Sequence, residues 1–364
     1  MSKKKQTNTA DASSGNTNPT LASSIREFRR KPVSAQHLFE GIRAGNTTVL
    51  SQAITLIESN NSAHAKLASD LLSQCLPYAN QSVRIGITGV PGVGKSTFIE
   101  SLGKLLTSLG KKVAVLAVDP SSSVTKGSIL GDKTRMEQLV KDPNAYIRPS
   151  AAGDSLGGVA RKTRESIILC EAAGFDTILI ETVGVGQSET AVHSMTDFFL
   201  LLHLTGAGDE LQGIKRGIIE MADTIVINKA DGDNLEKAKR EKTNLQHALH
   251  IWPAKDNDWT PPVILCSALE NKGIEELWGV ISSFFSANKK AGFFDKKRAH
   301  QNEYWLFQAI EERLKQDFFQ DKSIQAALKK ELQALHKNKK TPFEIAEELI
   351  RLHHSMRNNT TKKT

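Results

Sequence analysis

A glycine-rich stretch at residues 86–97, GITGVPGVGKST, constrains this chain more than any other feature. It fills every fixed position of the phosphate-loop pattern G-x-x-x-x-G-K-[ST], at Gly89, Gly94, Lys95 and Ser96. Residues 83–88 before it are apolar and β-branched, as in a buried strand, and residues 97–109 after it space apolar side chains at helical intervals. A strand, a glycine-rich turn and a helix in this order predict a nucleotide-binding α/β domain.

The predicted loop binds phosphate mainly through its main chain. Glycines let backbone N–H groups approach a phosphate without a Cβ in the way, and the following helix adds the positive end of its dipole. By the same pattern Lys95 reaches the β- and γ-phosphates, and the Ser96 hydroxyl binds Mg²⁺. The residues expected to hold the nucleotide here are Gly89, Val90, Gly92, Val93, Gly94, Lys95, Ser96 and Thr97.

Seven candidate strands alternate with helical segments from residue 83 onward, a pattern typical of a mostly parallel sheet covered by helices on both faces. We expect the strands at residues 83–88, 113–118, 145–148, 177–180, 198–204, 224–228 and 263–266. In such a sheet the ligand lies beyond the carboxyl ends of the strands, and the polar motifs of this chain follow the strands at that edge. The predicted fold class is therefore α/β, of the phosphate-loop NTPase type.

Two aspartates follow the second predicted strand. Asp119 precedes Pro120, and Asp132 lies within the stretch 127–136, GSILGDKTRM. Either carboxylate could hold Mg²⁺ or its waters, or orient an attacking water. Asp119 could equally cap a turn, and Asp132 could be a helix N-cap. From the residues alone, both interpretations stay open.

The fourth predicted strand is followed by Glu181 and, three residues later, by Gly184. In phosphate-loop enzymes a carboxylate at this place serves the metal, and the glycine N–H senses the γ-phosphate. The usual acid is aspartate, so glutamate is a departure. Val185 follows Gly184 where a water-positioning glutamine is usual. We therefore predict slow hydrolysis by the isolated protein, with acceleration by a partner or by dimer contacts.

A base-recognition motif N-K-x-D follows the sixth predicted strand, at Asn228, Lys229 and Asp231. The Asp231 carboxylate can accept both N1–H and the exocyclic amine of guanine, and adenine offers no matching donors. The motif therefore selects GTP over ATP. Asn228 and the stem of Lys229 would shape the base pocket, and the segment Ser267, Ala268 and Leu269 could supply an N–H to the guanine oxygen.

Residues 206–217, GAGDELQGIKRG, follow the fifth predicted strand with four glycines and four charges. This composition predicts a mobile polar loop at the catalytic edge, although an ordinary strand-to-helix connection would read the same way. Lys215 in this loop could neutralise charge in the phosphoryl transition state or pair with an acid across an interface.

The ends of the chain differ from its centre. Residues 1–30 have little to bury and are expected to form a disordered tail, and residues 31–80 show helical spacing broken at 45–46 and 59–61. Residues 81–288 form the predicted GTP-binding domain. Residues 289–364 return to helical periodicity and are expected to form an arm that dimerises, since its apolar stripes lie outside the closed α/β unit.

Composition narrows the class of protein further. The chain of 364 residues carries a net charge of +8, with its excess of Lys and Arg in the two end segments and no interleaved aromatics, which favours solvated surface over nucleic-acid binding. No apolar run approaches the ~20 residues of a membrane helix, and we expect no secretory signal or presequence. Three distant cysteines, Cys75, Cys170 and Cys266, fit a reducing cytoplasm.

From about residue 34 to residue 355 the sequence resembles the MeaB/ArgK family of GTPases, the methylmalonyl-CoA mutase-associated chaperones. The resemblance is carried by seven stretches: 86–97 GITGVPGVGKST, 118–122 VDPSS, 127–136 GSILGDKTRM, 156–160 LGGVA, 181–189 ETVGVGQSE, 206–215 GAGDELQGIK and 228–231 NKAD.

The resemblance implies a homodimeric, Mg²⁺-dependent GTPase that gates delivery of intact adenosylcobalamin to an acyl-CoA mutase and protects that enzyme. Asp119, Asp132 and Glu181 match family positions tied to Mg²⁺ and nucleotide switching, and glutamate at position 181 is normal for the family. The loop 206–217 matches the segment that signals to the mutase, and Lys215 matches its functional lysine. The expected catalytic set is therefore Lys95, Asp132, Glu181 and Lys215, with Ser96, Asp119, Asp132 and Glu181 at the metal.

Three other functions are compatible with parts of this pattern. A metal-delivery GTPase of the hydrogenase or urease maturation type shares the architecture but needs soft ligands, and His247 and His250 are the only spaced internal histidine pair. A scaffold in which GTP only switches binding would need no turnover. A kinase serving amino-acid transport would transfer phosphate to a protein instead of to water.

Overall fold

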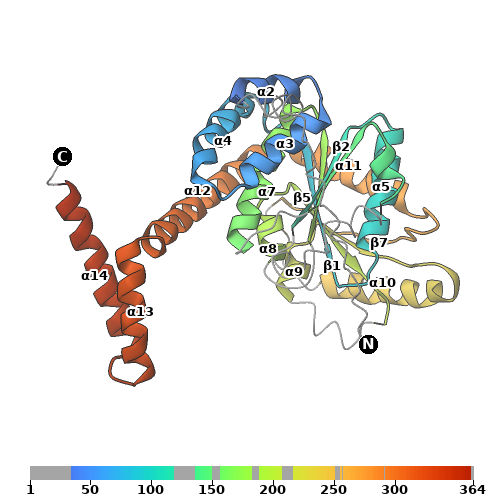
Figure 1. Ribbon diagram of the computed structural model, residues 1–364. Helices are drawn as coiled ribbons and strands as arrows, with labels where there is room; N and C mark the ends of the chain where they lie inside the picture. Colours follow the sequence, from blue (N-terminus) through green and yellow to red (C-terminus); the bar gives the residue numbers. More distant parts are fainter. Residues whose placement is uncertain are drawn as a thin grey trace, which may run out of the picture.

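The computed structural model describes residues 34–118, 136–149, 156–182, 188–206, 216–250, 255, 257–290 and 292–361 (Figure 1). Its centre is a seven-stranded sheet in the order β3-β2-β4-β1-β5-β6-β7, in which every neighbouring pair of strands is parallel. The strands are β1 (Val83–Gly89), β2 (Val113–Val118), β3 (Ala145–Arg148), β4 (Thr177–Thr182), β5 (Phe198–His203), β6 (Thr224–Ile227) and β7 (Val263–Leu265). The predicted fold class and all seven predicted strands are confirmed.

β2 and β3 have the predicted limits, and the carboxyl ends of the other five strands differ from the prediction by one or two residues. β4 continues through Glu181 and Thr182, because Glu181 pairs in register with Ile87 on one side and Ala117 on the other. The prediction ended this strand too early, since a carboxylate is usually unfavourable inside a buried strand. β6 stops at Ile227, and Asn228 is free of the strand while its backbone N–H still bonds the His203 carbonyl at 2.9 Å.

Helices cover both faces of the sheet (Figure 1). One face packs on α5 (Lys95–Ser108) and α11 (Ile274–Lys290) through a core that includes Ile85 and Ile87. On the other face lie α7 (Leu156–Ala172), α8 (Ser188–His193), α9 (Arg216–Met221) and α10 (Leu235–His250). Short 3-10 turns occupy Leu76–Tyr78, Leu139–Lys141 and Gly232–Asn234. Alternate residues of each strand face opposite cores, as the pleat of a doubly covered sheet requires.

Three helices precede the sheet: α2 (Ala35–Arg43), α3 (Thr47–Glu58) and α4 (Ser62–Cys75). Their N-caps are Ser34, Asn46 and Asn61, whose side-chain oxygens accept backbone N–H groups of the first turn. The predicted breaks at residues 45–46 and 59–61 are therefore confirmed, with asparagine as the cap in both. These helices share one hydrophobic cluster with α7 and with β2 and β4.

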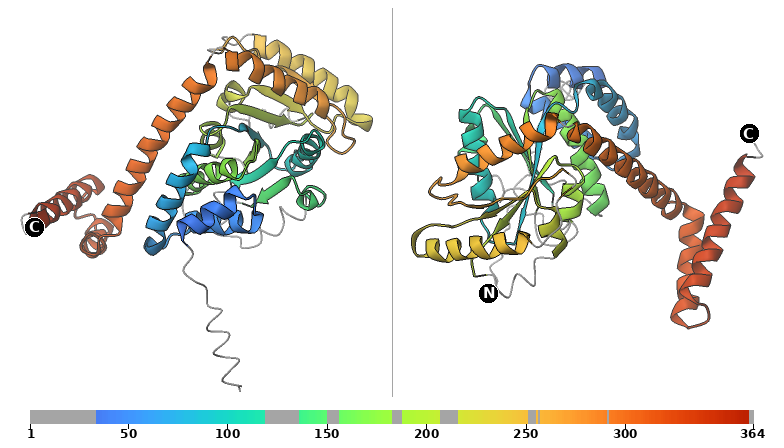
Figure 2. Two further views of the ribbon diagram at one scale, coloured as in Figure 1. Left: turned by 90° about the horizontal axis from the view of Figure 1, so that it is seen from above. Right: turned by 180° about the vertical axis from the view of Figure 1, so that it is seen from behind.

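After α11 the chain forms an arm of α12 (Phe293–Phe319), α13 (Lys322–His336) and α14 (Pro342–Thr361). α12 leaves the sheet domain, and α13 and α14 form a hairpin away from it (Figure 2). Pro342 opens α14, a position that suits proline because the first turn needs no N–H from it. Ile324, Ile345 and Leu349 are buried. The limits proposed for the domains along the chain stay predictions.

The arm presents apolar side chains to solvent. The predicted α12 stripe is exposed along its length, at Tyr304, Leu306, Phe307, Ile310 and Leu314. Phe343 on α14 is 83% exposed, and Phe307 is 63% exposed. Among the described helices, none is both long enough and apolar enough to cross a bilayer.

The start of α12 is joined to the turn that follows α8. Gln301 Nε2 donates to the Thr196 carbonyl at 2.8 Å, and Trp305 Nε1 donates to the Ser194 carbonyl at 3.2 Å. Arg298 donates from Nε and Nη2 to both carboxylate oxygens of Asp197, at 2.9 and 2.7 Å. One face of α12 thus holds residues 194–197 through side-chain donors.

Candidate functional site

The phosphate loop joins β1 to α5 at the carboxyl edge of the sheet. Gly89 ends β1, and a Cβ there would lie 2.6 Å from the Leu202 carbonyl oxygen, so only glycine fits. Gly94 caps α5 with φ of 93°, in the left-handed region, and its Cβ would lie 2.9 Å from Asn228 Nδ2. Both glycines let the main chain pass close to neighbouring segments. The N-terminus of α5, the positive end of its helix dipole, lies at the end of the loop.

Lys95 is the first residue of α5 and is largely buried. Its Nζ donates to the carbonyls of Gly89 at 2.7 Å and Val90 at 3.2 Å, so the ammonium lies under the loop. Burial lowers the pKa of Lys95 below its usual value, and the carboxylates of Glu181 and Glu189 oppose that shift. The cation is therefore held at the loop by two carbonyls and two nearby carboxylates.

Glu181 and Thr182 end β4, next to β1. Glu181 is buried, with 5% of its surface exposed, and Thr182 Oγ1 donates to Thr88 Oγ1 at 2.9 Å. This contact ties the end of β4 to the residue that precedes the phosphate loop. Glu181 thus lies in the sheet beside the loop lysine rather than in a free loop after the strand.

Asn228 connects the phosphate loop to the two loops predicted to bind the base. Its Nδ2 donates to the Val93 carbonyl at 2.8 Å, and its Oδ1 accepts the Ala268 N–H at 3.2 Å. Asn228 is 2% exposed. One side chain therefore joins segments that are 135 and 40 residues away in the sequence.

The other residues of the base motif lie against the same loops. Lys229 Nζ donates to the Gly92 carbonyl at 2.8 Å, so its stem runs along the phosphate loop. The Asp231 carboxylate accepts a hydrogen bond from the Ser267 hydroxyl, and Ser267 in turn accepts the Glu270 N–H at 3.2 Å. Leu269 is exposed beside them. The structure thus brings together the loop after β1, the loop after β6 and the loop after β7.

A family model described as "Methylmalonyl Co-A mutase-associated GTPase MeaB" matches residues 50–323. This chain belongs to the MeaB family. The match covers the phosphate loop, the end of β4 and the base motif.

MeaB-family relatives are similar over most of their length. The GTPase ArgK of Escherichia coli is 45% identical over 323 residues, which are 89% of this chain and 93% of ArgK. The mouse mitochondrial protein named methylmalonic aciduria type A homolog is 46% identical over 297 residues, which are 79% of this chain and 72% of that protein. The crystal structure of a protein described as an LAO/AO transport system kinase is 37% identical, with a TM-score of 0.69, and covers 89% of this chain and 99% of its own. Activity as a GTPase follows from the family.

Several predicted site residues lie outside the described residues of this MeaB-family protein. They are Asp119, Asp132, Gly184 and Lys215. The predicted tail at residues 1–30 and most of the loop 206–217 also lie outside the described residues. The described part of the chain places Lys95, Ser96, Glu181, Asn228, Lys229, Asp231, Ser267, Ala268 and Leu269 at one edge of the sheet.

The described residues fit a nucleotide with Mg²⁺. A backbone cradle that excludes a Cβ at Gly89 and Gly94 suits a phosphate chain. The Ser96 hydroxyl and the Glu181 carboxylate are oxygen donors, which Mg²⁺ prefers, and Mg²⁺ in such sites takes only one or two carboxylates along with substrate phosphates. Among the residues that the structure describes, no cluster of three His, Cys, Asp or Glu could form a metal cage of protein ligands alone.

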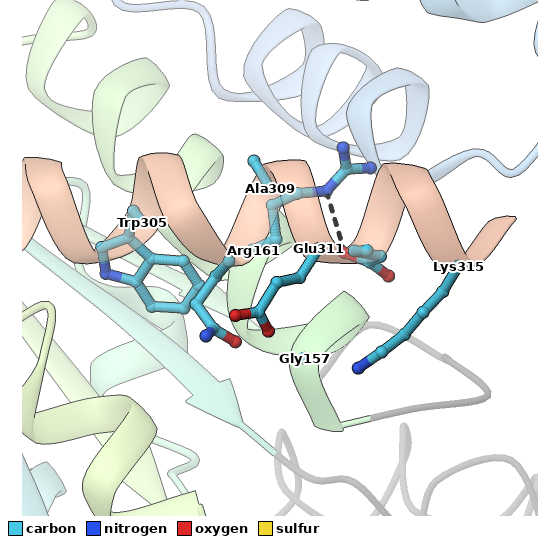
Figure 3. Close-up of a pocket in the computed structure, with 8 residues that line it drawn as sticks. Gly157, Arg161, Trp305, Ala309, Glu311 and Lys315 are labelled. Atoms are coloured by element: carbon cyan, nitrogen blue, oxygen red, sulfur yellow. Dashed lines mark ion pairs between the residues drawn. The ribbon is translucent and has the colours of Figure 1, made fainter. Parts of the chain in front are cut away.

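A separate cavity of about 260 Å³ lies between α7 and α12 (Figure 3). Its lining combines charged residues with an indole: Gly157, Arg161, Trp305, Gln308, Ala309, Glu311, Glu312 and Lys315. Arg161 Nε lies 3.8 Å from Glu312 Oε2, the ion pair drawn dashed in Figure 3. None of the predicted nucleotide residues lines this cavity, so it is distinct from the phosphate site.

Sequence reasoning missed three residues that bear on the site. Glu189 in the first turn of α8 is buried and acts electrostatically on Lys95. Thr205 donates to the side chain of Asn234, and Asn234 in turn donates to the Lys229 carbonyl. Glu189 belongs to the stretch 181–189 that carries the family resemblance. Its position as an acid at the start of a helix could have marked it as a residue near the site. Nothing in the sequence alone marked Thr205.

Proposed function

We propose that this protein is a GTPase chaperone whose binding and hydrolysis of GTP gate the loading of adenosylcobalamin into an acyl-CoA mutase of the methylmalonyl-CoA type, and protect that mutase. Support comes from the family, which is named for association with methylmalonyl-CoA mutase, and from a mouse relative named for methylmalonic aciduria. The binding of GTP is supported by the hydrogen bonds of Asn228, which join the phosphate loop to the base motif.

In this proposal the guanine ring lies over the Lys229 stem, and the Asp231 carboxylate accepts its N1–H and exocyclic amine. The Ser267 hydroxyl already donates to that carboxylate and holds it in place. The Ala268 and Leu269 N–H groups are the candidates for the guanine oxygen. The loop amides and Lys95 bind the phosphates.

Ser96 and Glu181 would hold Mg²⁺, together with Asp119 and Asp132. The metal supplies charge neutralisation on the β- and γ-phosphates. Within the chain, Lys95 and Lys215 would offset charge that develops on the transferred phosphoryl group, while Asp132 and Glu181 would orient the attacking water. Because Val185 stands where a glutamine is usual, we expect slow hydrolysis that the mutase accelerates.

The arm would form a homodimer. The exposed apolar stripe of α12, with Phe307 at its centre, is the surface that a second copy would bury. Three buried cysteines without a disulfide fit a reducing compartment, and we assign the protein to the cytoplasm.

The deciding experiment is a pull-down with the full chain loaded with a non-hydrolysable GTP analogue, compared with the same chain loaded with GDP. We expect a cobalamin-dependent acyl-CoA mutase to be recovered in a nucleotide-dependent way. Recovery of no such mutase would remove the partner assignment and leave the GTPase assignment intact.

Single-turnover hydrolysis with and without the recovered mutase then separates a GTPase chaperone from a GTP-switched scaffold. A chaperone shows a rate that rises with the mutase, whereas a scaffold shows binding without turnover. Assays with Ni²⁺ test the metal-delivery alternative, for which the described residues offer no cluster of soft ligands.

A further inference from the structure

The backbone of Lys229 has an unusual conformation. Its φ is 58°, in the left-handed region, which costs free energy for any residue with a Cβ. Such a conformation persists only where neighbouring contacts hold it. One contact that holds the Lys229 backbone is a hydrogen bond from Asn234 Nδ2 to the Lys229 carbonyl, at 2.7 Å.

Asn234 closes the turn that carries both base-binding side chains. Its backbone N–H donates to the Asp231 carbonyl at 3.0 Å, while its side chain reaches back to Lys229. The 3-10 turn Gly232–Asn234 lies between these two bonds. Asn234 therefore fixes the turn on both sides of Ala230 and Asp231.

Thr205 sets the orientation of the Asn234 amide. Thr205 Oγ1 donates to Asn234 Oδ1 at 2.5 Å, two residues after β5 ends at His203. A backbone carbonyl can only accept, so the amide nitrogen must face Lys229 and the amide oxygen must face Thr205. The chain Thr205–Asn234–Lys229 thus has a single hydrogen-bonding direction.

We propose that Asn234 and Thr205 are positioning residues for guanine selectivity. They hold the 229–234 turn so that the Lys229 stem stays against Gly92 and the Asp231 carboxylate stays at Ser267, where both meet the base. This inference rests on the proposed recognition of guanine by Asp231. It assigns a role in guanine recognition to two residues outside the base motif, and one of them, Thr205, lies in the connection that follows β5.

Both residues are half-buried, so water can replace much of a lost bond as far as folding is concerned. Base recognition is more demanding, because a bidentate pair requires its carboxylate in one place. We therefore expect substitutions here to change nucleotide selectivity more than they change the fold.

The test uses isosteric changes in the full chain. Asn234→Asp keeps the acceptor for Thr205 but replaces the donor that faces the Lys229 carbonyl, and Thr205→Val removes the hydroxyl at constant shape. Thr205→Ser restores the hydroxyl. Asp233→Asn, an exposed change in the same 3-10 turn, is the matched control for a change of one charge.

Calorimetry measures the dissociation constants for GTP, for inosine triphosphate, which lacks the exocyclic amine, and for tripolyphosphate, which has no base. We expect Asn234→Asp to lower the preference for GTP over inosine triphosphate by about tenfold and Thr205→Val by about threefold. Tripolyphosphate binding stays unchanged in every variant, and Thr205→Ser and Asp233→Asn keep the wild-type preference.

Two results would overturn the inference: an unchanged preference in both Asn234→Asp and Thr205→Val, or an equal loss for all three ligands, which indicates a general structural role. A wild-type protein that binds GTP and inosine triphosphate equally would instead contradict recognition of the guanine amine itself. The two failures are therefore distinguishable.

Discussion

The side-chain amide of Asn228 donates to the backbone oxygen of Val93 and connects the base motif to the phosphate loop. Because this bond is buried, Asn228→Asp would leave the Val93 carbonyl facing a carboxylate. We expect a loss of about 1–3 kcal/mol in the free energy of unfolding and at least tenfold weaker GTP binding. Urea denaturation and calorimetry measure the two effects. Asn61→Asp, at an N-cap where the side chain only needs to accept, should leave both at wild-type values.

Lys95 is predicted to be indispensable for binding phosphate. Lys95→Ala removes the ammonium that lies under the loop, so GTP, GDP and tripolyphosphate should all bind at least a hundredfold more weakly, since a charge-assisted contact to phosphate is lost. Lys104→Ala, on the same helix but exposed, is the control. Retention of normal GTP affinity by Lys95→Ala, with circular dichroism like that of the wild type, would contradict the assignment of this loop.

His193 should make the protein sensitive to mild acid. Burial, with help from the nearby cation Lys297, lowers the pKa of His193 to about 4 from its usual 6.5. The unfolded chain therefore binds a proton on this residue before the folded chain does. The associated stability is complete above pH 6.5 and is lost as the pH falls towards 4, by up to about 3 kcal/mol.

Urea denaturation of His193→Gln between pH 4 and pH 7 checks this dependence. The variant should show a flatter decline in stability with falling pH than the wild type. His247→Gln, an exposed histidine on α10, should keep the wild-type slope. Equal slopes for all three proteins would show that His193 is not the group responsible.

Arg298 is predicted to be a major contributor to stability at the start of the arm. Its two bonds neutralise Asp197, whose side chain is fully buried and also accepts the Arg84 backbone N–H at 3.0 Å. Arg298→Met leaves that charge unpaired and should cost about 3–5 kcal/mol, measured by denaturation. Adding Asp197→Asn should recover part of the loss. Arg313→Met, which removes an exposed pair on the same helix, should cost less than about 1 kcal/mol.

Phe307 is predicted to lie at a dimer interface. Light scattering of the wild type should give twice the monomer mass of 39.9 kDa, and Phe307→Glu should shift the protein towards the monomer because a charge would have to be buried. Gln316→Glu introduces the same charge about two and a half turns further along α12, on the opposite face, and should leave the dimer intact. A monomeric wild type at micromolar concentration would contradict the dimer proposal.

The sequence predicted the parts of this fold that have local causes. The phosphate loop, the strand cores and the breaks between the first helices each follow from residues close in the chain. The meeting of Asn228 with Val93 was implied only through the general rule that ligands lie at the carboxyl edge of a parallel sheet.

The remainder depends on long-range pairing. Glu181 stays in β4 because both neighbouring strands continue beside it, which no local pattern reveals. The bond between Thr205 and Asn234 depends on β5 and β6 being neighbours, and Thr205 has no local signature of its own. Similarly, the periodicity of α12 predicted a helix but not the contacts of Gln301 and Trp305 with the turn after α8.

The contacts of Gln301 and Trp305 with the turn after α8 couple that turn to the orientation of α12. At 1.5 Å per residue, the part of α12 from Gln301 to its last residue, Phe319, spans about 27 Å towards the hairpin of α13 and α14. A tilt of about 5° where Gln301 meets Thr196 would displace the far end by about 2–3 Å. Small movements of the turn between α8 and β5 are thus magnified at the tip of the arm.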